Sequence, residues 1–98
     1  MSFDFQFADE AKAQLADLAD NPAHAKRYKA VRAALGKLQI NTRHPGLRTH
    51  KFDELTGANG EAVFEAYAEN DTPGAYRIFW HYGPAKDLIT IVAITAHP

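Results

Sequence analysis

Cysteine is absent from this 98-residue chain, which excludes a disulfide framework and thiolate chemistry. No apolar run approaches the ~20 residues of a membrane-spanning helix, so no membrane partner is expected. The amino-terminal sequence has early acidic residues and lacks the basic segment and apolar run of a signal peptide. These absences predict a cytoplasmic protein. The length predicts one domain, residues 1–98, with one modest core.

Acidic residues are missing from residues 22–51, although the chain carries 12 of them elsewhere. The same segment holds eight of the 11 lysines and arginines: Lys26, Arg27, Lys29, Arg32, Lys37, Arg43, Arg48 and Lys51. The net charge of −1 hides this segregation. It can mark a surface for an anionic partner, either nucleic acid or an acidic protein segment. The alternative is a solvated basic face that acids from other elements balance in three dimensions.

The densest run of large apolar side chains is AYRIFWHY, residues 75–82. On a strand, one face would carry Tyr76, Ile78, Trp80 and Tyr82, and the other Arg77, Phe79 and His81. Both faces are therefore covered by large side chains, as is typical of a central strand. Arg77 is the exception, because an unpaired guanidinium is costly to bury. We expect it either to pair with an acid such as Glu65 or to face a functional surface.

The first half of the chain predicts a strand and a helical hairpin. Phenylalanines alternate with polar residues over residues 2–7, which indicates a half-buried strand. Asp9 can cap a helix that runs to about residue 19. After a break, Asn21 can cap a second helix with Pro22 at its first position. Only a short break joins the two helices, which favours a hairpin.

The second half predicts a loop and an antiparallel meander. Residues 41–51 form a basic loop, which we expect Leu47 to anchor to the core. Residues 52–60 are irregular or a short edge strand, and strands follow at residues 62–69, 75–82 and 88–95. Short turns join these three strands. The predicted fold is α+β, of order β-α-α-β-β-β. The helical hairpin packs on one face of a mainly antiparallel sheet, with the first strand at an edge.

This order of elements resembles the RelE/ParE superfamily, the small toxins of type II toxin–antitoxin systems. The resemblance covers essentially the whole chain and is carried by the strand motif YRIFW at residues 76–80, the closing segment ITAHP and the loop PGLRTHKF followed by VFEAY. It implies a cognate antitoxin as partner, with a homodimer as a further possibility. It also implies cleavage of mRNA on the ribosome. No cofactor is implied.

The resemblance also assigns candidate site residues. Arg77 matches the strand arginine that contacts the scissile phosphate, a role that suits a planar, permanently charged fork. His97 lies near the position of a proton-donating histidine or lysine after the last strand. His50 is the second candidate for proton transfer. The candidate nucleic-acid contacts are Arg43, Arg48 and Lys51 of the basic loop.

One strand departs from the ribonuclease pattern. Where these enzymes commonly place Lys or Arg, this chain carries Glu65 and Tyr67. Glu65 would repel a phosphate, but it could also act as a general base or pair with Arg77. The ParE branch shares the fold, lacks the ribonuclease residues and inhibits DNA gyrase. The alternative function is therefore a non-enzymatic binder of this fold, acting on gyrase or another protein.

Each candidate also has a simpler structural interpretation. Arg77 can be a salt-bridged core residue, and His97 a solvated terminal histidine. Trp80 and Tyr67 are expected in the core or at an interface rather than as base-stacking platforms. His44 and His50 are not expected to bind metal, because no cysteine or acid cluster accompanies them.

Overall fold

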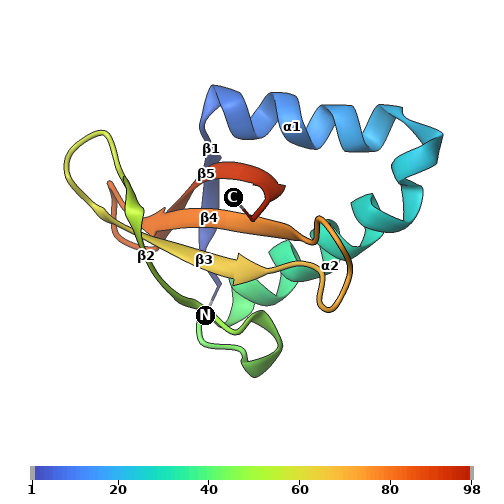
Figure 1. Cartoon of the computed structure of the whole chain (residues 1–98). Coiled ribbons are helices and arrows are strands. Elements are labelled where there is room, and N and C mark those ends of the chain that lie inside the picture. Colours follow the sequence, from blue (N-terminus) through green and yellow to red (C-terminus); the bar gives the residue numbers. More distant parts are fainter. Residues whose placement is uncertain (1, 98) are drawn as a thin grey trace.

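The computed structural model describes residues 2–97, which form a five-stranded mixed sheet and two α-helices (Figure 1). The elements in chain order are β1 (Asp4–Phe7), α1 (Asp9–Asp20), a 3₁₀ turn (Pro22–His24), α2 (Ala25–Ile40), a second 3₁₀ turn (Pro45–Leu47), β2 (His50–Thr56), β3 (Ala62–Tyr67), β4 (Tyr76–Tyr82) and β5 (Leu88–Ala96). The strand order is β1-β5-β4-β3-β2. Strand β1 pairs in parallel with β5, and the other neighbours are antiparallel. The predicted α+β fold, with the first strand at an edge, is confirmed.

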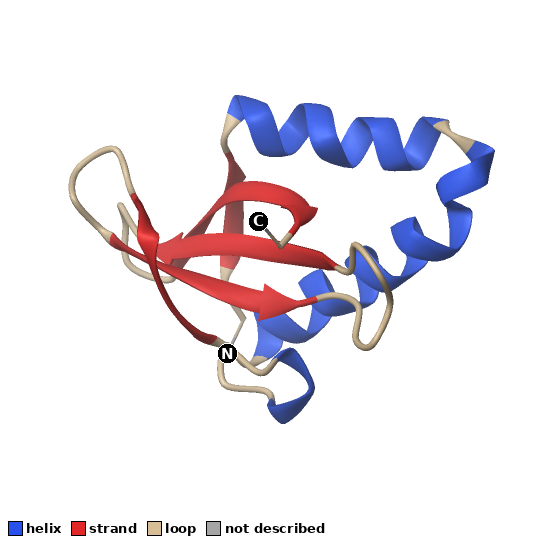
Figure 2. Ribbon diagram, viewed as in Figure 1, coloured by secondary structure: helices blue, strands red, loops and turns tan. Residues whose placement is uncertain are grey.

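Both helices cover the same face of the sheet (Figure 2). Alternation along β4 directs Ile78 and Trp80 towards the helices, where they are buried with Val31 and Leu38 of α2 and Ile91 of β5. The three amino-terminal phenylalanines pack against this cluster, as their alternation predicts. Burial of apolar surface on this side is the main force that fixes the helical hairpin to the sheet.

The opposite face of the sheet has no helix over it among residues 2–97 and carries a smaller apolar cluster. Phe79 of β4 packs there with Phe52, Val63 and Ala93. Phe79 and Arg77 share this face because they are two residues apart on one strand. The predicted assignment of β4 as a two-sided central strand is therefore confirmed, and Arg77 lies on the face that the helices leave open.

The segment after the basic loop is an edge strand, the second of the two states that the sequence allowed. Strand β2 starts at His50, so His50 and Lys51 lie on a strand rather than in the loop. Only Phe52 of β2 is buried, and the pairing with β3 is irregular between Lys51 and Thr56. An edge strand with one buried side chain gives almost no alternation, which is why its start could not be read from the sequence.

The helix boundaries differ slightly from those expected. Asp9 is the first residue of α1 and not its cap. Ala8 precedes the helix, and its N–H donates to the carbonyl of Ile91, so β1 passes directly into α1. The Asn21 side chain does accept from the N–H of Ala23, but it caps the 3₁₀ turn that leads into α2.

Candidate active site on the open face of the sheet

Glu65 of β3 is at the centre of a polar cluster on the open face. Its side chain is only 1% exposed, although it is a carboxylate in an apolar strand. His50 lies directly opposite on β2, Arg77 is on β4, and His97 follows β5. The backbone N–H of His97 donates to the carbonyl of Ala75, which continues the pairing of β5 with β4 past its last residue. The register of four neighbouring strands thus brings together His50, Arg77 and His97, the three residues predicted to be catalytic.

All three side chains contact the Glu65 carboxylate. His50 Nε2 lies 2.7 Å from Oε1, although these atoms are not aligned for a hydrogen bond. His97 Nδ1 forms a hydrogen bond with Oε2. Arg77 Nε is 3.9 Å from the same Oε2, which is a long ion pair. Glu65 therefore does pair with Arg77, as the sequence suggested, but its closest partners are the two histidines.

Hydrogen bonding determines where protons lie in the cluster. His50 Nδ1 is 3.0 Å from the carbonyl oxygen of Arg48, and a carbonyl only accepts, so Nδ1 carries a proton. His50 Nε2 faces Glu65 Oε1 at 2.7 Å. His97 donates from Nδ1 to Glu65, and within residues 2–97 no hydrogen bond occupies its Nε2.

Arg77 is held firmly by protein groups. Its Nη1 donates to the backbone carbonyls of Glu69, at 2.8 Å, and of Tyr76, at 3.3 Å. Its guanidinium carbon lies 3.7 Å from the centre of the Tyr67 ring, a cation–π contact. The side chain is 12% exposed, and its Nε has no hydrogen-bond partner among the described residues. The arginine is thus part of the packed sheet, with little of its side chain exposed.

Tyr67 belongs to the site, although the sequence interpretation placed it in the core or at an interface. It is half-buried, two residues after Glu65 and directly opposite Arg77. Its ring centre lies 5.8 Å from the Arg48 guanidinium carbon and 6.0 Å from the His50 ring. The sequence could have indicated this, because residues 65 and 67 of one strand point to the same face, so Tyr67 had to lie beside Glu65.

The three candidate nucleic-acid contacts are not gathered at one point. Arg48 reaches the cluster through Tyr67 and has a left-handed backbone, with φ of 46°. Lys51 points away from the Glu65 face, because it alternates with His50, and forms a 3.5 Å surface pair with Asp53. Arg43 lines a cleft, described below, that Arg48 and His50 also line. The predicted anchor of the loop, Leu47, is fully buried.

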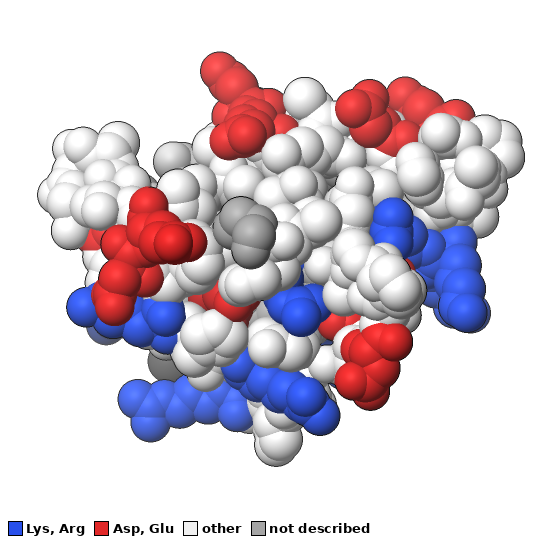
Figure 3. Space-filling view, viewed as in Figure 1, with Lys and Arg blue, Asp and Glu red and all other residues white. Residues whose placement is uncertain are grey.

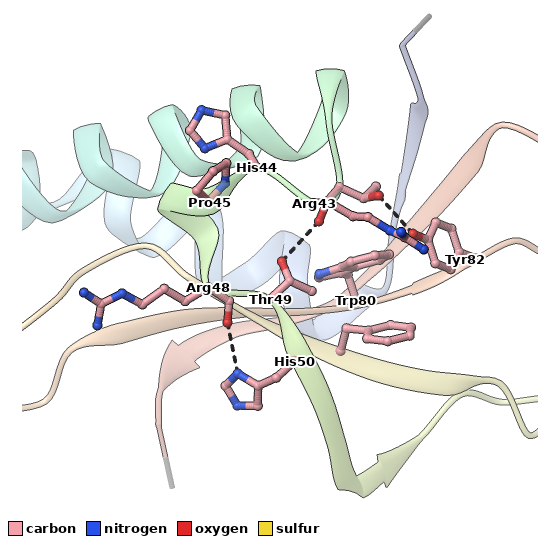
Figure 4. Close-up of a pocket in the computed structure, with 10 residues that line it drawn as sticks. Arg43, His44, Pro45, Arg48, Thr49, His50, Trp80 and Tyr82 are labelled. Atoms are coloured by element: carbon pink, nitrogen blue, oxygen red, sulfur yellow. Dashed lines mark hydrogen bonds between the residues drawn. The ribbon is translucent and has the colours of Figure 1, made fainter.

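That cleft, of about 480 Å³, lies between the basic loop and the ends of β3 and β4 (Figure 4). Arg43, His44 and Arg48 line it from the loop. Phe64, Trp80 and Tyr82 line it from the sheet, so the cleft combines basic and aromatic groups.

Charge is segregated on the surface as well as along the sequence. Figure 3 shows acidic side chains along α1 at the upper margin and basic ones at the lower margin, where Figure 1 places the loop between α2 and β2. Part of the basic segment is nevertheless paired: Arg27 of α2 lies 2.8 Å from Glu69 and 4.4 Å from the Tyr76 ring centre. Arg27 is thus less available to a partner than its exposed neighbours Lys26 and Lys29.

Among residues 2–97, no group of three or more His, Asp or Glu side chains is arranged to hold a metal ion. The described helices include none that is long and apolar enough to cross a membrane.

Two solved structures share this architecture over the whole chain. The YoeB dimer from Staphylococcus aureus superimposes with a TM-score of 0.64 at 14% identity, covering 100% of both chains. The archaeal RelE–RelB complex from Pyrococcus horikoshii OT3 gives a TM-score of 0.62 at 15% identity, covering 98% of this chain and 96% of the other. No protein-family model matches the sequence, and neither does any curated protein. The chain therefore has the fold of YoeB and RelE, and the resemblance seen in its sequence is confirmed at the level of the fold.

Proposed function

We propose that this protein is the toxin of a type II toxin–antitoxin system and that it cleaves mRNA on the ribosome at the Glu65 cluster. One observation carries the proposal: a buried carboxylate is held between two half-exposed histidines, with an arginine as its third partner. Two histidines with accessible edges can supply the acid and the base of RNA cleavage without a metal ion. The fold shared with YoeB and RelE supports the same activity.

The proposed reaction is an internal transfer at phosphorus. The ribose 2′-oxygen attacks the adjacent phosphate and loses its proton, the bond from phosphorus to the 5′-oxygen breaks, and that oxygen takes up a proton. The products are a 2′,3′-cyclic phosphate and a 5′-hydroxyl. The enzyme must therefore accept one proton, deliver another and stabilise the added negative charge.

The two histidines are the proton carriers in this proposal. Both side chains are 49% exposed, whereas Glu65 is too buried to touch RNA. His97 exchanges its proton at Nε2, and Glu65 accepts a hydrogen bond from its Nδ1 and so fixes the ring. His50 is the second carrier. Glu65 is a positioning residue that orients both rings.

Positive charge for the phosphate comes from the two arginines that flank Tyr67. The Arg77 guanidinium carbon lies 3.7 Å from the centre of the Tyr67 ring, and the Arg48 guanidinium carbon lies 5.8 Å from the same centre. The fixed Arg77 provides a preorganised charge that needs no rearrangement during the reaction. Arg48, which is exposed, provides a contact that follows the RNA backbone.

The test uses purified protein and ribosomes that carry a defined mRNA, with cuts mapped by primer extension. The wild-type chain should cut, and His97→Gln and Arg77→Gln should cut far more slowly. The matched controls, His24→Gln in the turn between the helices and Arg32→Gln on α2, should cut like wild type. An uncut message with wild-type protein would refute the proposal.

An antitoxin is the partner proposed for the chain. The exposed edge of β2 and the basic loop before it could receive a partly disordered acidic segment, through strand pairing and charge. Co-expression with the protein of the neighbouring open reading frame, followed by co-purification, tests this. Light scattering of the chain alone tests the homodimer.

A non-enzymatic binder of the same fold is the second candidate. It is favoured by the burial of Arg77, whose guanidinium is occupied by two carbonyls and an aromatic ring. A gyrase supercoiling assay run in parallel with a translation assay separates the two candidates. Loss of supercoiling with intact translation would favour the binder.

A further inference from the structure

Of the residues that line the cleft between the basic loop and the sheet, the reaction proposed above uses only Arg48 and His50. The cleft is about 480 Å³ in volume, which is large enough for one nucleotide but not for a folded partner. Its walls come from segments far apart in the sequence: the loop after α2, and strands β3 and β4. We therefore considered what chemistry its lining could recognise.

Trp80 carries a hydrogen-bond donor that lacks an acceptor at this cleft. The residue is 1% exposed, it lines the cleft, and no acceptor for its Nε1 lies among the described residues. Figure 4 shows the indole between Thr49 and Tyr82, with its nitrogen on the Thr49 side. A buried N–H without a partner is unfavourable. A ligand that brings an acceptor atom into the cleft would satisfy it.

An aromatic surface lies beside this donor. Tyr82 is 44% exposed, and its hydroxyl is hydrogen-bonded to Thr42 Oγ1 at 2.9 Å, so an accessible ring is held in a fixed position. It packs edge-on against Trp80, with ring centres 4.9 Å apart, and lies 5.8 Å from Phe64. Fixed, exposed aromatic rings are the surfaces on which unpaired nucleobases stack.

Donors for an anion lie on the loop side. The N–H of Gly46 donates to His44 Nδ1 at 3.0 Å, which holds that ring over its own loop, so Arg43 is the donor that reaches the cleft. Figure 4 shows the Arg43 side chain reaching over the cleft towards Tyr82, while Arg48 extends the other way. The loop around this cleft carries no acidic residue.

We infer that this cleft binds one nucleotide of an RNA strand, with its base against Tyr82, a base acceptor towards Trp80 Nε1 and its phosphate on Arg43. The inference rests on the proposed function, because it assigns the nucleotide next to the cleaved bond. Arg48 and His50 line the cleft and also reach Tyr67 and Glu65 of the cluster. A strand whose phosphate lies at the cluster therefore passes a neighbouring nucleotide into the cleft.

Trp80 is the only tryptophan of the chain and lines this cleft, so its fluorescence provides a probe of binding there. The experiment titrates the protein with AMP, GMP, CMP and UMP, and with inorganic phosphate and adenosine as partial ligands. At least one nucleoside monophosphate should change the fluorescence saturably, and phosphate or adenosine alone should bind more weakly. Calorimetry on the same samples measures affinity without relying on the tryptophan.

Three variants locate the binding. Arg43→Gln removes a charged contact to the phosphate and should weaken binding about tenfold, while Arg32→Gln on α2 should leave it unchanged. Tyr82→Leu removes the stacking surface and should weaken binding to a similar degree. Circular dichroism confirms that each variant is folded. If Tyr82→Leu unfolds, the effect of Arg43→Gln on nucleotide binding alone tests the inference.

The outcomes separate this inference from the proposed function. Saturable binding that Arg43→Gln weakens supports the cleft, even if the protein leaves mRNA uncut. No saturable binding of any nucleoside monophosphate, or binding that Arg43→Gln leaves unchanged, overturns the cleft assignment even if mRNA is cut. Binding of inorganic phosphate as tight as that of the nucleotides also overturns it, because the aromatic surface would then play no part.

Discussion

The Glu65 carboxylate and His97 Nδ1 are hydrogen-bonded across 32 positions of sequence. Glu65 is buried, whereas half of the His97 side chain is exposed. This pairing fixes the ring so that one nitrogen faces the protein and the other is left for a substrate. The hydrogen bond makes His97, the last described residue, part of an ordered site.

Glu65→Gln should reduce mRNA cleavage by about 100-fold or more, because a neutral amide cannot pair with both histidines and Arg77 as the carboxylate does. The loss should appear in kcat, with KM nearly unchanged, since Glu65 is too buried to bind RNA. Glu54→Gln, on the exposed part of β2, is the control. A Glu65→Gln enzyme of wild-type kcat would show that the cluster has only a structural role.

His97→Gln should lower the cleavage rate by ~10²–10⁴-fold, the usual contribution of one acid–base group. The ring is half-exposed and the glutamine amide can still donate to Glu65, so the free energy of unfolding should change by less than about 1 kcal/mol. Single-turnover cleavage and urea denaturation measure the two effects. Equal cleavage by His97→Gln and His24→Gln would exclude His97 from proton transfer.

Arg77→Lys should destabilise the fold by about 2 kcal/mol, because an ammonium loses the planar contact with Tyr67 and cannot reproduce the carbonyl contacts of the guanidinium. Arg32→Lys is a matched control, since Arg32 lies 5.7 Å from the Tyr28 ring on the helix surface. It should change stability by less than about 0.5 kcal/mol. Equal effects from the two variants, measured by urea denaturation, would contradict the packed role of Arg77.

Arg48→Gly should stabilise the fold by about 1 kcal/mol while weakening RNA binding, because the backbone at Arg48 has φ of 46°. Arg48→Ala keeps the backbone strain and removes the same charge. It should therefore weaken binding equally without any gain in stability. Thermal denaturation and RNA binding of the two variants separate backbone from side chain. Identical stabilities would show that the left-handed conformation carries no strain.

Glu61 provides a prediction on pH. The backbone N–H groups of Glu61 and Asn59 hold the pKa of its carboxyl below the ordinary value of 4.5. A lowered pKa in the folded state means that the charged carboxylate stabilises the turn fully above that ordinary value. The contribution is lost as the pH falls through the folded-state pKa. The stability difference between wild type and Glu61→Gln should therefore shrink on acidification, and a difference independent of pH would contradict this.

Much of the fold follows from local patterns in the chain. Alternation fixes the two faces of β4, and Asn21 with Pro22 marks the break between the helices. Strand β2 is the weak point, because an edge strand with Phe52 as its only buried residue shows little periodicity. Lys51 shows a related limit of prediction from sequence. The basic loop could be recognised in the sequence, but the strand that starts at His50 directs Lys51 to the face opposite Glu65.

The sequence by itself determined that Arg77 is an unusual charge in a central strand, that Glu65 is a possible partner, and that basic residues gather before β2. Only the tertiary structure decided that His50, Arg77 and His97 all meet Glu65, and that Tyr67 joins the two arginines. The physical reason is the distance along the sequence over which the relevant interactions act. Side-chain direction along one strand depends on local backbone geometry, whereas contacts across β2, β3, β4 and β5 depend on registers that are set by the packing of the whole sheet.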